Sequence, residues 1–289
     1  MNKTKKKVRI SDWIITGLIV LCASLSILLL LTIILFVVRK GIGSVSWSFL
    51  TTVTNARKGT VGIAGNIVNT ILIIALTMLF VIPLGVGAAI YLNEYAKPGK
   101  LVTVIEFATE VLSGIPSIIF GLFGMMFFGE TLGLGYILLT GALTLILMVL
   151  PIVIRNTQEA LKTVPDGYRF GAIGLGAGKW YMIRTILIPS AMPGILTGVI
   201  LAIGRIVGES AALLFTAGSA KHLPKGILGI FDRIFESGGT LTIQLYLSAT
   251  SEGNFDVAFG IAFVLLVIVL GINLAAKRIT NHFDATKRK

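Results

Sequence analysis

Charged residues are scarce in this sequence. Asp, Glu, Lys and Arg together make up 13% of its 289 residues, whereas soluble domains carry about 25%. Hydrophobic residues supply 55% of the chain. This balance excludes an ordinary soluble domain and predicts a membrane protein.

Cysteine and histidine are almost absent as well. The single cysteine, Cys22, lies in an apolar run, so no intrachain disulfide can form and redox chemistry is not expected. His222 and His282 have no Cys, His or carboxylate neighbours at metal-ligand spacing. No Ser-His-Asp or Cys-His arrangement stands out. We therefore expect no metal site, no catalytic residue and no resident cofactor in this chain.

Long apolar runs, in contrast, are abundant. A bilayer is crossed by about 20 helical residues, and six runs reach that length. They occupy residues 13–38, 67–92, 105–128, 132–154, 190–217 and 257–276. The predicted fold class is therefore an all-α polytopic membrane protein with six transmembrane helices. The first run is longer than the roughly 7 to 15 apolar residues of a signal peptide, so we expect an uncleaved anchor.

The runs divide the chain into three parts. Residues 1–66 form a tail, the first transmembrane helix and an external loop, residues 67–276 form the transmembrane core, and residues 277–289 form a basic tail. Within the core, residues 155–189 form the longest cytoplasmic segment. The connections are too short for a separate globular domain.

The basic residues predict the orientation in the membrane. The net charge of +12 is not gathered into a face with aromatic neighbours, so we expect no nucleic-acid partner. With the N-terminus inside, 17 of the 25 Lys and Arg residues fall in inner segments, 7 fall in outer segments, and Arg205 lies within a span. The positive-inside rule then places both termini in the cytoplasm.

Two ionisable residues interrupt the fifth apolar run. Arg205 and Glu209 are four residues apart, so one continuous helix would carry them on the same face. A charge at bilayer depth is costly and is tolerated mainly where it faces a partner, a bundle interior or water. The residues alone leave two interpretations open: a structural ion pair that fixes a helix interface, or part of a solute pathway.

Other features of the spans predict local structure. Pro83 is expected to kink or break the second span. Glu106 and Glu110 share one face of the third span with Ser113, and their carboxylates are either solvated, paired with loop cations, or part of a transport path. Small residues in the fifth span predict close helix packing, in two stripes: Gly194, Gly198 and Ala202, and Gly204, Gly208 and Ala212. Two amphipathic stretches, residues 226–237 and 240–250, are expected to form short helices at the outer mouth.

The inner segment contains GLGAGKW, which superficially suggests a phosphate-binding loop. That pattern requires glycine at position 173 and Ser or Thr at position 180, where the chain has Ile173 and Trp180. No ATP site is therefore expected in this chain.

The same segment resembles the coupling motif of the membrane subunits of ABC importers, E-A-A-x3-G-x9-I-x-L-P. Aligned on the final proline, the chain supplies Phe170, Gly171, Ala172, Gly176, Ile186, Ile188 and Pro189. Phe170 replaces the acidic residue, and Ile188 replaces the leucine. This departure weakens any hydrogen bond assigned to the acidic position, whereas docking through apolar and backbone contacts would survive it.

Three further stretches resemble the membrane subunits of phosphate importers. They are SGIPSIIFGLFG at 113–124, QEALKTVPDGYR at 158–169 and AIGRIVGESAALLFTAG at 202–218. The last is similar to the PstA family of subunits rather than to the PstC family. The resemblance covers residues 66–276 and implies the MetI-like transmembrane fold of type I ABC importers, in a prokaryotic cell membrane.

The resemblance also implies partners and a role for the buried charges. A subunit of this kind pairs with a PstC-like second permease, two PstB-like subunits that bind ATP and Mg, and a PstS-like phosphate-binding protein, in contact with membrane lipids. Arg205 and Glu209 fall on positions that the family uses for transport. Their chemistry is compatible, because a guanidinium stays charged and offers planar, bidentate donors to a phosphate.

Two alternatives remain at this point. A permease for sulfate or molybdate would use the same arginine chemistry. A stand-alone secondary transporter or channel often shows paired repeats with broken helices in both halves, and no second copy of the 170–215 pattern is apparent.

Overall fold

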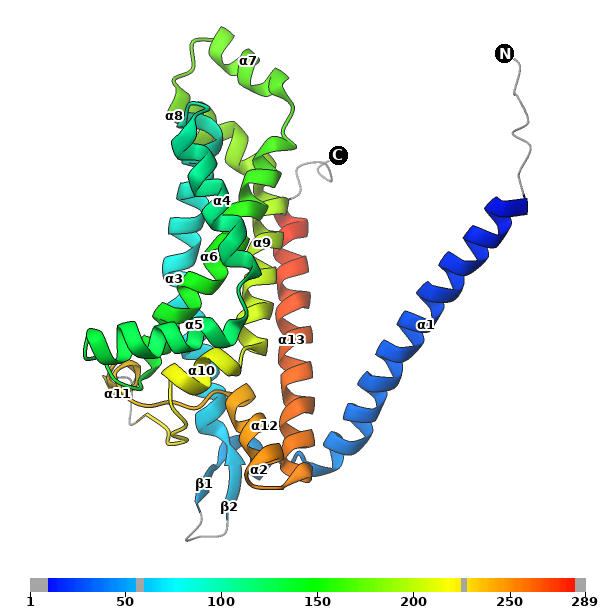
Figure 1. The fold of residues 1–289 in the computed structure, drawn as a ribbon, viewed down its shortest axis with the longest axis vertical. Coiled ribbons are helices and arrows are strands. Elements are labelled where there is room, and N and C mark those ends of the chain that lie inside the picture. Colours follow the sequence, from blue (N-terminus) through cyan, green and yellow to red (C-terminus); the bar gives the residue numbers. More distant parts are fainter. Residues whose placement is uncertain (1–9, 56–59, 225–227, 284–289) are drawn as a thin grey trace.

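A computed structural model describes residues 10–55, 60–224 and 228–283, and the chain in it is mainly helical (Figure 1). Residues 1–9 and 284–289, which belong to the two predicted basic tails, lie outside the described residues. Within the described part, five helices are long and apolar enough to cross a membrane, and one bent pair of helices can count as a sixth span. The expected fold class is confirmed, with two of the expected spans broken.

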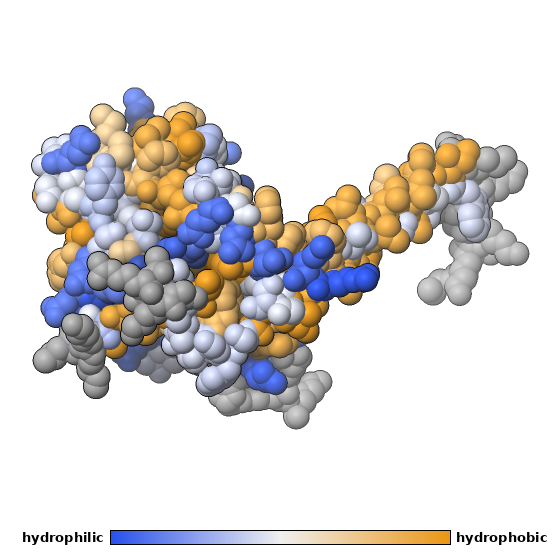
Figure 2. Space-filling view, turned by 90° about the horizontal axis from the view of Figure 1, so that it is seen from below, coloured by the Kyte–Doolittle hydropathy of each residue, from blue (hydrophilic) through white to orange (hydrophobic). Residues whose placement is uncertain are grey.

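The first span forms an arm that stands away from the bundle. Helix α1, Ile10–Gly41, has 32 residues, which corresponds to a length of about 48 Å. Its apolar side chains are exposed along almost the whole helix, and Figure 2 shows the arm as a largely apolar surface. The C-terminal end of α1 contacts the N-terminal end of helix α13, Phe255–Phe283. There the rings of Phe36 and Phe259 meet edge to face, with their centres 5.5 Å apart.

A small hairpin follows the arm. A 3-10 turn, Ile42–Ser44, and helix α2, Trp47–Thr51, lead into strands β1, Val53–Asn55, and β2, Thr60–Ile63. The strands pair antiparallel, with Val53 opposite Ile63. The expectation of an all-α chain therefore needs this one addition, which lies at the end of the molecule opposite helix α7 (Figure 1).

The centre of the bundle is made by helices α3, Ala64–Ile90, α6, Leu138–Lys162, and α9, Ile188–Gly208. The side chains between them are apolar and fully or almost fully buried: Val81, Leu145, Met148, Val153, Ala202 and Ile206. Helix α3 continues through Pro83 and then widens into a π-helix, Tyr91–Tyr95. Pro83 therefore does not break the helix, which was one of the two effects expected for it.

The third expected span is not one helix. It begins as helix α4, Lys100–Gly114. After a break it continues as α5, Ser117–Gly124, and the π-helix Met125–Thr131. The two parts are bent by 102° relative to each other. The break has a local cause, because the residue before a proline disfavours the helical conformation. Ile115, which precedes Pro116, is extended at φ −72° and ψ 132°. The prediction of a continuous span over 105–128 is wrong.

The fifth expected span is also interrupted. Helix α9 ends at Gly208, Glu209 is extended, and a short helix α10, Ala211–Thr216, follows. The prediction of one helix over 190–217, with Arg205 and Glu209 on a shared face, is therefore wrong. The two expected amphipathic helices beyond it are present as α11, Leu228–Ile234, and α12, Leu241–Thr250.

The two stripes of small residues differ in their surroundings. A Cβ atom built on Gly198 would lie 2.6 Å from the Cβ atom of Asn156 on α6, and one built on Gly194 would crowd Ala160. The first stripe thus packs as expected. A Cβ atom on Gly204 or Gly208 would meet no atom within 4 Å among the described residues, so the prediction of packing for these two glycines is wrong for this chain by itself.

This difference predicts how two matched substitutions behave. Gly198→Val forces α9 away from α6, and overpacking of this kind costs about 1–3 kcal/mol. Gly204→Val meets open space, and its effect should stay within about 0.5 kcal/mol. Thermal unfolding of the purified chain in detergent measures both. Equal melting temperatures for the two variants would contradict this account of the α6–α9 interface.

Candidate functional site

The predicted coupling segment forms a protruding helix at one end of the molecule (Figure 1). Helix α7, Asp166–Gly174, is followed by a turn, by helix α8, Lys179–Met182, and by a π-helix, Ile183–Leu187, that leads into α9. The first eight residues of the expected segment, 155–162, belong to the end of α6 instead. The protrusion therefore begins after Lys162.

The glycine of the motif has a clear structural role. Gly176 has φ +80°, in the left-handed region that glycine adopts without steric cost. Its N–H bonds to the carbonyl of Ile173 at 2.9 Å, and the N–H of Ala177 bonds to the carbonyl of Ala172 at 3.0 Å. These two bonds are the Schellman arrangement that ends a helix. Gly176 therefore fixes where α7 stops and the chain turns back.

The motif residues divide into an inner and an outer set. Ala172 is buried, and Ile186 and Ile188 are partly buried, in an apolar cluster beneath α7 that includes Leu161 and Leu187. Phe170, Gly171 and Pro189 are exposed. The structure thus brings the inner set together and leaves the outer set at the surface.

The tip of this segment, which we call the α7 tip, carries uncovered apolar side chains. Phe170 is 73% exposed and Leu175 is 91% exposed. Further exposed large side chains on the same segment are Tyr168, Ile173, Trp180 and Tyr181. A cluster of exposed apolar side chains is typical of a protein–protein contact. The α7 tip is therefore suited to docking a partner.

The two charged residues at the end of α9 have different environments. Glu209 is buried, its carboxylate accepts the N–H of Ala212 at 3.0 Å, and its backbone carbonyl accepts the hydroxyl of Thr242 at 2.8 Å. The carboxylate thus satisfies a backbone donor at the start of α10 that would otherwise lack a partner. Glu209 fixes the break between α9 and α10 and ties it to α12.

Arg205 has no such partner. Its side chain is exposed, and across the described ranges it takes part in no hydrogen bond or ion pair. It lies between Gly204 and Gly208, on the face of α9 that has open space around both glycines. The predicted pairing of Arg205 with Glu209 does not form here, so the interpretation as a structural ion pair is not supported in this conformation.

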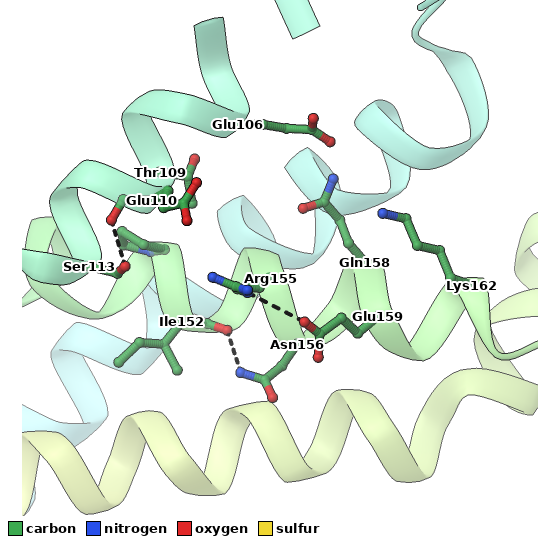
Figure 3. Close-up of a pocket in the computed structure, with 11 residues that line it drawn as sticks. Glu106, Thr109, Glu110, Ser113, Ile152, Arg155, Asn156, Gln158, Glu159 and Lys162 are labelled. Atoms are coloured by element: carbon green, nitrogen blue, oxygen red, sulfur yellow. Dashed lines mark hydrogen bonds and ion pairs between the residues drawn. The ribbon is translucent and has the colours of Figure 1, made fainter. Parts of the chain in front are cut away.

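A polar cavity opens between α4 and α6 (Figure 3). Its volume is about 380 Å³. The α4 side chains that line it are Glu106, Thr109, Glu110 and Ser113, and the polar α6 side chains are Arg155, Asn156, Gln158, Glu159 and Lys162. The expectation that the two α4 carboxylates share a face with Ser113 is confirmed. Arg155 contacts Glu159 of its own helix at 3.3 Å.

A buried arginine organises the opposite end of the molecule, near the hairpin. Arg233 of α11 is fully buried, and its Nε donates to the Asn69 side-chain oxygen of α3 at 3.0 Å. Its Nη1 contacts Glu236 at 2.9 Å and the ring nitrogen of His222 at 2.6 Å. The contact with α3 is not apparent from the sequence, because nothing near Arg233 in the chain indicates a partner on α3.

The chain is similar to known membrane transport proteins. A family model described as "Binding-protein-dependent transport system inner membrane component" matches residues 81–289. The probable ABC transporter permease protein YqgI of Bacillus subtilis is 37% identical over 279 residues, which cover 93% of this chain and 95% of that protein. The phosphate transport system permease protein PstA 1 of Mycobacterium tuberculosis is 37% identical over 210 residues, which cover 72% of this chain and 66% of that protein.

The fold has a counterpart among solved structures. A chain of the MetNI methionine ABC transporter, in an inward-facing conformation, superposes with a TM-score of 0.60 at 19% identity. The match covers 74% of this chain and 93% of that chain. The expected MetI-like fold of a type I importer is confirmed by this likeness.

The cluster around Arg233 predicts a dependence of stability on pH. The adjoining His222 ring and the Arg233 guanidinium hold the pKa of Glu236 below its ordinary value of 4.5. The stabilisation is therefore complete above about pH 4.5 and is lost as the pH falls through the lower pKa of the folded state. Glu236→Gln should lower the melting temperature at pH 7, and its difference from the unsubstituted chain should shrink as the pH falls below 4.5 and through the lower pKa of the folded state.

Melting curves in detergent across this pH range measure the effect. Glu130→Gln is the matched control, since Glu130 is exposed and forms no ion pair within the described part of the chain. A Glu236→Gln deficit that does not shrink at any pH below 4.5 at which the unsubstituted chain still unfolds cooperatively would refute the assignment.

Proposed function

Because the chain belongs to the family of binding-protein-dependent transport system inner membrane components, we propose that it is the PstA-like permease subunit of an ATP-driven phosphate importer. A permease of this family is a multi-pass membrane protein that works with a second permease, an ATPase and an extracytoplasmic binding protein. For this chain, we propose PstC-like, PstB-like and PstS-like partners in those roles. ATP and Mg would be held by the ATPase subunits.

The orientation is part of the proposal. The N-terminal end of α1 and the C-terminal end of α13 lie toward the end of the molecule that carries α7 (Figure 1). The distribution of Lys and Arg favours the cytoplasm for both termini. The α7 tip would then face the ATPase, and the hairpin end, with α11 and α12, would face the binding protein.

Substrate handling is assigned to Arg205, and this residue carries the proposal. Its guanidinium is exposed and without a partner among the described residues, at a helix end inside an apolar span. An arginine in this setting can form charge-assisted, bidentate bonds to a phosphate that passes between two permease subunits. Glu209 acts indirectly, because it holds the α9–α10 break that presents Arg205.

Coupling is assigned to the α7 tip. When ATP closes the ATPase dimer, a docked α7 is carried with it, and the apolar cluster beneath α7 passes the movement to α9. The same helix carries Arg205 at its other end. Access to Arg205 would thus alternate between the two sides of the membrane.

A different oxyanion is the alternative that this site also permits. Sulfate and molybdate offer oxygen acceptors to the same guanidinium. The names of the relatives favour phosphate. A stand-alone secondary transporter or channel is disfavoured, because the family works with an ATPase.

Arg205→Gln should strongly reduce transport and leave assembly intact. Hydrogen bonds to a charged group contribute about 1.5–3 kcal/mol, so the loss corresponds to roughly a 10- to 150-fold reduction in phosphate uptake. Uptake of radiolabelled phosphate by cells that express the variant measures this. Arg39→Gln, which removes an exposed arginine from the end of α1, is the control.

Normal phosphate uptake by a well-expressed Arg205→Gln variant would remove Arg205 from the pathway. Competition by excess sulfate or molybdate in the same assay decides the substrate. If either anion displaces phosphate and is itself accumulated, the phosphate assignment gives way to that oxyanion.

The docking role of the α7 tip has its own test. Central apolar anchors of an interface contribute about 2 kcal/mol or more, so Phe170→Ser should weaken binding of the ATPase by roughly 30-fold. Co-purification from detergent measures the amount of ATPase retained. Phe255→Ser, at an exposed aromatic residue of the hairpin end, is the control. Full retention of the ATPase by the Phe170 variant would exclude this surface.

A further inference from the structure

The coupling segment is bonded to α3 as well as to the cluster beneath it. Arg169 of α7 reaches Glu94, which lies 75 residues earlier in the π-helix that extends α3. The Nη2 atom of Arg169 is 3.0 Å from the Glu94 Oε1 atom, and its Nε atom is 3.4 Å from the same oxygen. One guanidinium thus bridges two elements that are distant in sequence.

The same guanidinium also bonds to the last turn of α6 and to the turn that follows it. Its Nη1 donates to the carbonyl of Val164 at 2.9 Å, and its Nη2 donates to the carbonyl of Leu161 at 2.9 Å. Carbonyls at the end of a helix lack partners within the helix and are favourable sites for a cation. Arg169 therefore holds α3, α6 and α7 at one point.

The two carboxylates that contact Arg169 differ in their exposure to solvent. The Glu94 side chain is 6% exposed and that of Arg169 is 17% exposed, whereas the side chain of Asp166 is 77% exposed. The Glu94 oxygen also accepts the side-chain N–H of Asn93 at 2.7 Å. A buried charge that loses its partner is strongly destabilised, so Arg169 and Glu94 must move together. An exposed pair such as Arg169–Asp166 imposes little constraint.

A second contact joins the same two regions. The Lys179 ammonium group of α8 lies 4.8 Å from the centre of the Tyr95 ring, in the π-helix at the end of α3. The turn that follows α7 is thereby also attached to α3. This contact makes the extension of α3 a common attachment point for both sides of the coupling segment.

The other end of α3 is anchored just as specifically. Asn66 and Asn69 are buried, and their side-chain N–H groups donate to the carbonyl of Gly239 at 2.9 and 3.0 Å. Asn69 also accepts from the buried Arg233 of α11. One helix with its π-helical extension, Ala64–Tyr95, therefore connects the coupling segment to the segment around α11, over about 48 Å.

We propose that the Arg169–Glu94 pair is the latch through which movement of α7 is transmitted to α3 and, along α3, to the segment that contains α11. Both are positioning residues, since neither lies at Arg205. This inference rests on the proposed function, because it requires that a partner ATPase moves α7. It goes further by adding a second route, through α3, to the route through α9.

Glu94→Gln tests the latch, with Asp166→Asn as the matched control. Each substitution removes one carboxylate from Arg169 and preserves the shape of the side chain. The complex of the chain with its own permease and ATPase partners is reconstituted in vesicles with the binding protein. The measured quantity is the number of phosphate ions imported per ATP hydrolysed, which a purely structural loss of complex does not change.

We expect this ratio to fall by at least about fivefold in Glu94→Gln and to stay near the reference in Asp166→Asn. The double variant Glu94→Gln, Arg169→Gln should be no worse than the poorer single variant, because partners in one interaction are not additive. An unchanged ratio in Glu94→Gln, or an equal fall in Glu94→Gln and Asp166→Asn, overturns the latch.

If Glu94→Gln does not assemble, Glu94→Asp decides. Its carboxylate keeps the charge but is drawn back from Arg169 by one methylene group, so a lowered ratio supports the latch and an unchanged ratio overturns it. The unsubstituted complex separates this proposal from the proposed function. If it imports sulfate in place of phosphate, the substrate assignment fails, and the ratio of sulfate to ATP tests the latch. If it hydrolyses ATP and imports no oxyanion, both proposals fail.

Discussion

In a membrane, every backbone N–H and C=O group must find its partner within the protein, because the lipid offers none. The rest of this structure depends on how that constraint is met where helices break. At the α9–α10 break, the Glu209 carboxylate bonds to the Ala212 N–H, and the Glu209 carbonyl bonds to Thr242. A carboxylate used in this way is committed to the backbone. The neighbouring Arg205 is therefore left without the carboxylate as a partner, as its proposed role in the pathway requires.

Polar groups concentrate at the two ends of α3, while its middle is apolar apart from the buried Thr77. At one end lie Asn66, Asn69 and Arg233, and at the other end lie Glu94 and Arg169. The apolar core around the middle of α3 sets its distance from the neighbouring helices. It does not fix the position of α3 along its own axis, since apolar packing tolerates sliding more readily than a charged hydrogen bond does. A helix held by directional bonds at both ends behaves as a connecting element, and the proposed coupling uses this property.

The sequence was a good guide to features that depend on neighbouring residues. Hydrophobic length located the spans, and the spacing of Glu106 and Glu110 correctly predicted their common face. Gly176 was identified from the motif, and its left-handed conformation explains why glycine stands there. The break at Pro116 could also have been predicted, because an X-Pro step disfavours a helix. The long apolar run favoured a continuous span instead.

The features that sequence reasoning missed depend on residues far apart in the chain. Arg169 and Glu94 are separated by 75 positions, and Arg233 and Asn69 by 164. Glu209 illustrates a different difficulty, since a carboxylate four residues after an arginine fits a helical ion pair and a helix cap equally well. Only the conformation at Glu209 distinguishes the two.

The exposed phenylalanine at the acidic position of the coupling motif has a thermodynamic consequence. A contact made through Phe170 and Leu175 is driven by burial of apolar surface. Such a contact is weakened by cooling and is strengthened by salts that are excluded from protein surfaces, whereas an ion pair at that position would be screened by added salt. The union of this subunit with its ATPase should therefore tolerate high ionic strength and loosen in the cold.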